Sequence, residues 1–227
     1  MFKGSRVSVL ALVAAAAFAG AAGAPRAAGS DVLASSGFEA DAPMTSVPLL
    51  SEGAQDCSST TGGISWVETH SGGKRYRLSD LGTGGESRGI ALPLSESVIS
   101  GTLVVTAELV AAQSDRRGGE VCLEEPAEGE WCMSGGFGED GKLRLHGQAT
   151  DFAYEAGVTY RITATVQIAP NATSVDYFVE DLSDPENTFS LADREVAGLV
   201  TASRLCFRTG FADDGSWAVD EIEVVRQ

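Results

Sequence analysis

Hydrophobic and polar residues alternate along several long stretches of this chain. Residues 160–168 place Tyr, Ile, Ala, Val and Ile on one side, and Arg, Thr, Thr and Gln on the other. The same period of two recurs in residues 103–109, 142–146 and 175–180. Alternation of this kind is typical of β-strands that have one face in a core and the other in water. The pattern therefore predicts an antiparallel all-β protein.

Turn signals stand between the alternating stretches. Asp140-Gly141 and Asp214-Gly215 each separate two apolar runs, and Asp-Gly favours tight hairpins because glycine tolerates the positive φ that such turns need. Pro170-Asn171 and residues 71–73 join two further pairs of predicted strands. The acidic pair Glu124-Glu125 is also assigned to a turn, as a solvated loop.

These elements predict a fold class. They amount to about twelve strands, and one short helical connector at residues 190–196 is the only helical candidate. The 27 glycines of the chain also favour tight turns over helices. Many short strands around a single core indicate an all-β, two-sheet antiparallel β-sandwich, a jelly roll.

The first residues have the three-part pattern of a secretory signal peptide. Lys3 and Arg6 precede the apolar run 7–19, and small residues follow at 20–24. The run is shorter than the roughly 20 residues of a membrane span. We expect residues 1–24 to be removed on export, so that the protein is secreted or periplasmic; the alternative is a retained membrane anchor.

The remaining chain is expected to be one soluble domain. Residues 25–30 are predicted as a flexible N-terminus and residues 31–227 as a single jelly-roll domain. No second apolar run approaches membrane length, which predicts no membrane insertion. We expect a monomer.

Charge narrows the possible partners. The net charge is −16, and removal of Lys3 and Arg6 takes it to −18. Such an excess repels nucleic acid, which proteins bind mainly by neutralising phosphates with Lys and Arg. It is compatible with neutral glycans and with divalent cations. The alternative is that the charge only keeps an exported protein soluble.

Four cysteines in an exported chain predict two disulfides. Of the three possible connectivities, we expect Cys57–Cys206, which ties the start of the domain to its last strands, and Cys122–Cys132, which closes a short loop within one hairpin. A zinc site is the competing interpretation. It lacks support because the chain has no C-x2-C pair and only two histidines.

Three segments resemble the concanavalin A-like jelly rolls, a group that includes laminin-G-like domains and many carbohydrate-binding modules. Ser36–Asp41 is similar to their Gly-Phe-Glu opening strand, and residues 159–166 with 175–179 are similar to a central hairpin. Residues 217–224 are similar to a closing strand that reads aromatic-x-Val/Ile-Asp-Asp-Ile-x-Val, with Glu221 in place of the second Asp. The resemblance implies a jelly roll with the first and last strands side by side.

The resemblance also implies one structural calcium ion where those two strands meet. Glu39 and Asp220 are the candidate ligands, with Asp41 or a backbone carbonyl nearby. Calcium takes several oxygen ligands, and clustered carboxylates need a cation. The alternative is that both acids are exposed or cap turns.

Signals for catalysis are sparse. Asp220, Glu221 and Glu223 form the densest carboxylate cluster, but their spacing differs from that of jelly-roll glucanases. Residues 75–77 (Arg-Tyr-Arg) and 144–146 (Arg-Leu-His) could supply the base and the charge neutraliser of a polysaccharide lyase. A Ser-His-Asp triad would have only two histidines available, His70 and His146.

Aromatic residues indicate sugar binding, because pyranose rings stack on flat apolar faces. We take Trp131, Trp66 and Tyr76 as candidate carbohydrate-binding residues, with burial in the core as the alternative for each. Trp217 is expected in the core, by analogy with the aromatic residue that opens the closing strand.

The sequence thus predicts an exported, non-catalytic β-sandwich protein whose partner is a glycan or another surface polymer. Two alternatives stay open. One is a polysaccharide lyase or glycoside hydrolase of the same fold, and the other is a structural or adhesive cell-envelope protein.

Overall fold

The structure is a computed structural model that describes most of the chain after residue 29. The described residues are 30–44, 46, 50, 53–57, 63–71, 73–80, 88–125, 130–170, 172–196, 201–209 and 215–227, without the side chains of residues 63 and 130–132. The predicted signal peptide, residues 1–24, and all but the last residue of the predicted flexible N-terminus, residues 25–30, lie outside this set.

The described residues form fifteen strands in two sheets, and every pairing is antiparallel. The eight-stranded sheet has the order β13 (Asp184–Val196), β12 (Thr173–Asp181), β11 (Thr159–Ile168), β6 (Gly101–Ala111), β15 (Ser216–Arg226), β4 (Gly73–Asp80) and β3 (Gly63–His70), with β1 (Asp31–Ser36) also paired to β15. The seven-stranded sheet has the order β10 (Gln148–Ala153), β9 (Lys142–Leu145), β8 (Glu130–Phe137), β7 (Gly119–Glu125), β14 (Ala202–Arg208), β5 (Gly89–Val98) and β2 (Gln55–Asp56).

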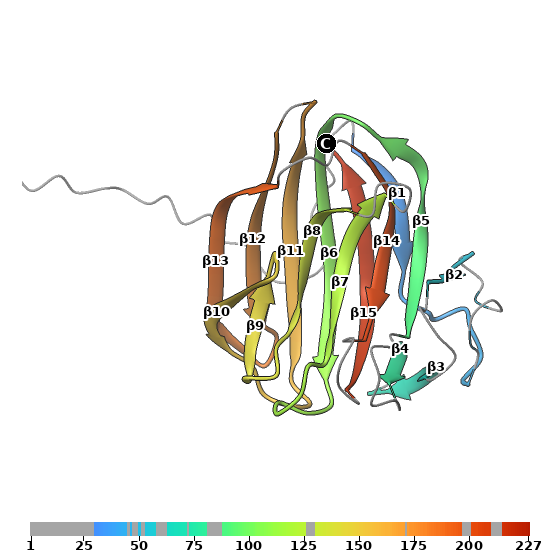
Figure 1. The fold of residues 1–227 in the computed structure, drawn as a ribbon. Helices are drawn as coiled ribbons and strands as arrows, with labels where there is room; N and C mark the ends of the chain where they lie inside the picture. Colours follow the sequence, from blue (N-terminus) through green and yellow to red (C-terminus); the bar gives the residue numbers. More distant parts are fainter. Residues whose placement is uncertain are drawn as a thin grey trace, which may run out of the picture.

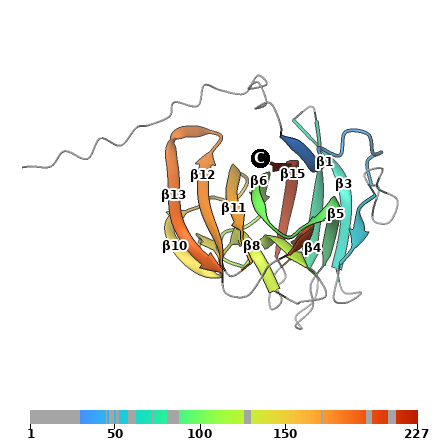
Figure 2. The ribbon, with the colours of Figure 1, turned by 90° about the horizontal axis from the view of Figure 1, so that it is seen from above.

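The two sheets lie face to face as a sandwich (Figure 1), and the view from above shows their two layers (Figure 2). The alternating apolar side chains of both sheets meet between the layers. On β11 the residues from Tyr160 to Ile168 alternate between buried and partly exposed, as their sequence pattern predicts. Trp217 is fully buried, which confirms its expected place in the core. Its ring lies 6.4 Å from that of Phe137 and 6.3 Å from that of Phe207.

The predicted all-β, two-sheet antiparallel sandwich is confirmed, and two local predictions are wrong. Residues 190–196 belong to strand β13, because Phe189 and Leu191 alternate with exposed residues and pack on the core beside β12. Ser36–Asp41 is not a strand, since β1 ends at Ser36 and the chain then turns. Phe38 has a φ of 58° there and stacks on Tyr76 at 5.3 Å between ring centroids.

No helix among the described residues is long and apolar enough to cross a membrane.

One of the two predicted disulfides is present. Cys57 and Cys206 are bonded, 149 residues apart in the chain. Cys122 is instead a free and buried thiol, so the expected Cys122–Cys132 bridge is not formed here; the Cys132 side chain lies outside the described residues. The strand register explains the position of Cys122, which lies opposite Cys206 on β14 and Ser134 on β8.

Loss of the disulfide should destabilise the fold. Cys57→Ser should lower the free energy of unfolding by about 2–5 kcal/mol, because the bond closes a very long loop in the unfolded chain. Chemical denaturation measures this change. Cys122→Ala is the matched control, which removes one buried sulfur and should cost only about 1 kcal/mol. Equal losses in the two variants would contradict a structural role for the bond.

Candidate functional site

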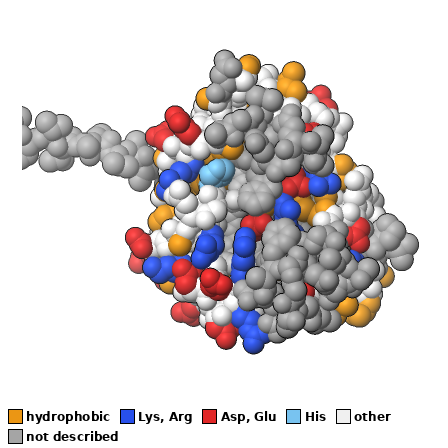
Figure 3. All heavy atoms as spheres, in the orientation of Figure 1, with side chains coloured by type: hydrophobic (Ala, Val, Ile, Leu, Met, Phe, Trp, Pro, Cys, Tyr) orange, Lys and Arg blue, Asp and Glu red, His pale blue; other side chains and the backbone are white. Residues whose placement is uncertain are grey.

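The outer face of the seven-stranded sheet carries the candidate site. On β7 and β14, Val121, Leu123, Leu205 and Phe207 belong to the hydrophobic core. Since side chains alternate along a strand, the residues between them point away from the core. We call this outer surface the front face; it is turned toward the viewer in Figures 1 and 3.

Two strands of the front face carry complementary charges. On β7 the outward residues are Glu120, Cys122 and Glu124, and the register pairs them with Arg208, Cys206 and Arg204 on β14. An acid-Cys-acid series therefore lies beside an Arg-Cys-Arg series. Opposite charges directly across an antiparallel pair stabilise the pairing.

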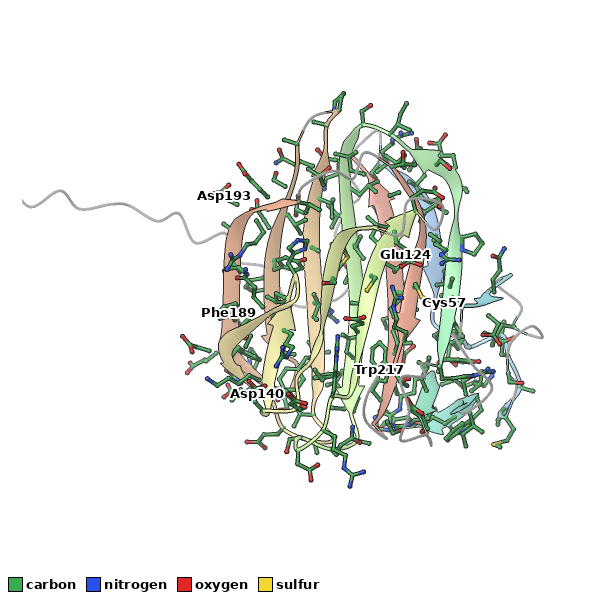
Figure 4. All side chains as sticks on the ribbon, viewed as in Figure 1. Cys57, Glu124, Asp140, Phe189, Asp193 and Trp217 are labelled. Carbon is green, nitrogen blue, oxygen red and sulfur yellow. A yellow bond between two sulfur atoms is a disulfide. The ribbon has the colours of Figure 1, made fainter. Side chains whose placement is uncertain are left out.

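Salt bridges join these residues into what we call the charged ladder. Glu124 accepts hydrogen bonds from Arg204 Nη2 at 2.6 Å and from Arg208 Nη2 at 2.6 Å. Glu120 accepts one from Arg117 Nη2 at 2.9 Å, and its other oxygen lies 3.6 Å from Arg208 Nε. Glu124 lies over strands β7 and β14 in Figure 4.

Burial makes the ladder rigid. Glu120 is 7% exposed and Glu124 is 5% exposed, although both face away from the core. Buried carboxylates are tolerated when cations and hydrogen bonds surround them, and removal of one partner is costly. Burial and the charge of Glu120 raise the pKa of the Cys122 thiol, which therefore stays neutral between the charged pairs. The front face thus holds polar groups in fixed positions.

A hollow of about 110 Å³ opens beside the ladder. Arg117, Glu120, Ser134 and Arg144 line it together with glycines of β7 and β8. Figure 3 shows basic side chains gathered near the middle of this face, with acidic ones next to them. The hollow therefore offers charged donors and acceptors at the surface of a rigid sheet.

Two glycines allow the close packing of the sheet beneath the hollow. A Cβ on Gly136 would lie 2.0 Å from the carbonyl oxygen of Gly119, and a Cβ on Gly119 would lie 2.1 Å from Nε1 of Trp217. Neither position can therefore carry a side chain without a shift of the backbone or of the core. The close approach of β7 and β8 depends on these residues.

Arg144 lies across the hollow from the ladder, on β9 and opposite Gly136. Among the described residues no carboxylate pairs with its guanidinium, in contrast to Arg204 and Arg208. Its Nε lies over Gly138, where an added Cβ would come within 2.9 Å of it. Arg144 is therefore a cation of the hollow without an ion-pair partner in the described chain.

His146 follows Arg144 in the turn between β9 and β10. It has a φ of 51°, so it lies in a turn and not on the polar face of a strand. Its Nδ1 is buried without a hydrogen-bond partner, as is Nε of Arg194. Burial and the charge of Arg194 lower the pKa of His146. The imidazole is therefore neutral near pH 7.

The three aromatic candidates do not form one platform. Tyr76 is fully buried and donates a hydrogen bond to Ser65 at 3.0 Å, so its assignment as a sugar-binding residue is wrong. Trp66 is partly exposed on β3, in the eight-stranded sheet. Trp131 is on β8 in the seven-stranded sheet, where the register pairs it with Glu124 of the charged ladder; its side chain lies outside the described residues.

The predicted metal ligands lie near the junction of β1 and β15, on the other sheet. Glu39 accepts hydrogen bonds from the backbone N of Lys74 at 2.6 Å and, through its carbonyl, from Lys74 Nζ. Asp220 Oδ1 accepts a hydrogen bond from the backbone N of Glu221 at 2.9 Å. No group of three or more His, Cys, Asp or Glu residues suited to a metal occurs in the described part of the chain. The described side chains therefore do not make a closed set of calcium ligands.

Asp220 is nevertheless an unusual carboxyl group. It lies across from Glu108 in the pairing of β15 with β6. Burial raises the pKa of Asp220 to about 7, the Glu221 amide opposes this shift, and the charges of Glu221, Glu108 and Glu39 add to it. Negative charge is therefore concentrated at this end of the eight-stranded sheet.

Sequence reasoning missed the charged ladder. It placed Glu124-Glu125 in a solvated loop, whereas both residues belong to β7. The signal is present in the chain as two short series with a period of two, Glu120-x-Cys122-x-Glu124 and Arg204-x-Cys206-x-Arg208. Pairing them requires the knowledge that β7 and β14 are neighbours, which the sequence alone does not provide.

Comparisons with known proteins support the fold. No family model and no curated protein match the chain. Solved structures do, and three of them illustrate the likeness. The carbohydrate esterase vb_24B_21 from the Shiga toxin-encoding bacteriophage phi24B has a TM-score of 0.53 and 12% identity, covering 88% of this chain and 100% of that one.

Two lectins are also similar. Lectin UEA-II, solved in complex with galactose, has a TM-score of 0.50 and 10% identity over 87% of this chain and 98% of that one. Peanut lectin, solved with a nine-residue peptide, has a TM-score of 0.50 and 7% identity over 81% and 94%. At such low identity the likeness concerns the fold alone. With its two packed antiparallel sheets, the chain has the β-sandwich fold of these proteins, which agrees with the jelly roll that the resemblance to concanavalin A-like domains implies.

Proposed function

We propose that this protein is an exported, non-catalytic carbohydrate-binding β-sandwich that holds a glycan on its front face. The observation that carries the proposal is the hollow beside the charged ladder, where Arg117, Glu120 and Arg144 line a rigid surface. The similar structures include a lectin in complex with galactose and a carbohydrate esterase, which supports this class of ligand.

The chemistry of the hollow suits sugar hydroxyls. Guanidinium groups supply several donors in a fixed plane, and carboxylates accept hydrogen bonds from two neighbouring hydroxyls. The volume of about 110 Å³ is below the roughly 300–1,000 Å³ of pockets that enclose a whole small molecule. We therefore expect one sugar substituent to enter the hollow while the rest of a polymer chain lies along the open face.

Export is part of the proposal. The N-terminal pattern of residues 1–24 and the Cys57–Cys206 disulfide both fit an oxidising compartment. N-terminal sequencing of the exported protein should find a start within or directly after the small residues 20–24. An intact Met1 in the mature protein would contradict this part.

Trp131 and Trp66 provide a test of which face binds. Trp131→Ala should weaken glycan binding more than about fivefold, because loss of an aromatic stacking surface costs about 1 kcal/mol. Trp66→Ala, on the other sheet, is the matched control and should leave the affinity unchanged. Titration calorimetry with glycans identified on an array measures both. A larger effect of Trp66→Ala would move the site to the eight-stranded sheet.

A polysaccharide lyase is the second candidate function. It is favoured by Arg144 at the hollow and by the neutral state of His146, since a lyase needs a charge neutraliser and a base. The carboxylates proposed for a hydrolase, Asp220, Glu221 and Glu223, lie instead on β15 of the other sheet. Release of unsaturated sugars would support the lyase. If neither glycan binding nor product release were detected, a structural or adhesive cell-envelope protein would be favoured.

A structural calcium ion near Glu39 and Asp220 stays a prediction. Backbone carbonyls and water would have to complete the ligand set, and the concentration of negative charge around Asp220 supports a cation there. The melting temperature should fall in the presence of a chelator and recover when calcium is restored. An unchanged melting temperature would eliminate the ion.

The pH dependence of stability tests the same carboxyl group. The pKa of Asp220 is about 7 in the folded protein and near 3.8 in the unfolded chain, so the folded state holds an extra proton between these values. Without calcium, this group should make the free energy of unfolding fall as the pH rises from about 4 to 7. Asp220→Asn should remove that slope in denaturation curves. Bound calcium would flatten it too, because calcium favours the ionised carboxylate.

A further inference from the structure

We infer that the glycan held on the front face is anionic, and that a carboxylate or sulfate group of the sugar chain binds to Arg144 in the hollow. The inference deepens the proposed function and rests on it. It depends on three observations: the local charge balance, the unpaired state of Arg144, and a further cation beyond the hollow.

The first observation is that the front face has a local excess of positive charge. The ladder and the hollow together hold four guanidinium groups, from Arg117, Arg144, Arg204 and Arg208, and two carboxylates, from Glu120 and Glu124. Asp140 is also close, since its Oδ1 and Arg144 Nε lie 2.6 Å and 2.9 Å from the point where a Cβ on Gly138 would be. With Asp140 included, the described part of this surface is positive by one charge in a chain of net charge −16. A neutral sugar gains no electrostatic attraction from this excess of positive charge, whereas an acidic sugar is attracted by it.

The second observation distinguishes Arg144 from the other arginines. Glu124 engages Arg204 and Arg208, and Glu120 engages Arg117, at 2.6–2.9 Å. Arg144 has no such partner among the described residues. A guanidinium that lines a hollow can accommodate a carboxylate or a sulfate through two parallel hydrogen bonds. Arg117, with its side chain 35% exposed, keeps donors for a second contact.

The third observation is a further cation beyond the hollow, Arg194 on the edge strand β13 of the eight-stranded sheet. Gly147 lines the hollow, and His146 precedes it in the chain. Arg194 acts electrostatically on His146, and each of these side chains has a buried nitrogen without a hydrogen-bond partner in the described chain. Arg194 on β13 therefore adds one cation beyond the hollow, next to the neutral His146. This arrangement fits a polymer with repeated negative charges better than a single charged sugar.

The experiment compares charged sugars with matched neutral ones. Titration calorimetry of the purified exported protein would use oligogalacturonate, its methyl ester, a sulfated galactan oligosaccharide and the unsulfated galactan. We expect the charged members to bind at least about tenfold more tightly than their neutral partners. The uronate pair and the sulfate pair show which anion is preferred.

Arg144→Gln should weaken binding of the preferred charged glycan about 10- to 100-fold, as expected for loss of a charge-assisted hydrogen bond. Binding of the neutral partner should not change. Arg161→Gln is the matched control, because Arg161 is a partly buried arginine of β11 in the other sheet, paired with Glu108 at 2.6 Å. Melting temperatures of both variants show that the fold is retained.

The outcomes separate the inference from the proposed function. Equal affinity for charged and neutral sugars, or an unchanged affinity in Arg144→Gln, would overturn the anionic ligand while leaving carbohydrate binding in place. Binding of the neutral sugars alone would do the same. If no glycan of a wider array bound, the proposed function and the inference would fail together.

Discussion

The front face depends on two carboxylates that are buried in the middle of a sheet without belonging to the hydrophobic core. Glu120 and Glu124 need cations at close range, and the opposing strand supplies them as Arg208 and Arg204. This requirement fixes the register of β7 against β14, because a slip by one residue would place each charged residue against a core residue. Since Glu120 and Glu124 pair with Arg117, Arg204 and Arg208, Arg144 is the arginine of the hollow that has no carboxylate partner among the described residues.

Much of the architecture follows from local patterns. The alternation in residues 160–168 and 103–109 predicts β11 and β6, and the structure pairs those two strands along their whole length. Local signals fail where an element is defined by its neighbours. Residues 190–196 contain too few apolar positions to mark a strand on their own, and only the pairing with β12 makes them one. Phe38 follows β1 in a conformation that is rare for residues other than glycine, and burial of its ring compensates for this.

The candidate site was harder to predict than the fold. Its aromatic ring makes Tyr76 a candidate for sugar binding in the sequence. Every second residue of an alternating strand faces the core, however, and on β4 Tyr76 is one of these buried residues. Arg144 and Glu120 meet at one hollow although they lie on β9 and β7, with β8 between them. Such a meeting is set by strand order. The order of strands in a jelly roll cannot be obtained from periodicity or from turn residues alone.

The glycines beneath the hollow have a consequence for how related sequences should vary. The backbone of β7 leaves no room for a side chain at Gly136, and the ring of Trp217 leaves none at Gly119. Both should stay glycine in any protein with this packing, whether or not a ligand binds there. Their retention would therefore report on the sandwich. Packing does not require an arginine at position 144. Its retention or replacement among related proteins would therefore depend on the ligand, and a change at that position would indicate a change in what the front face binds.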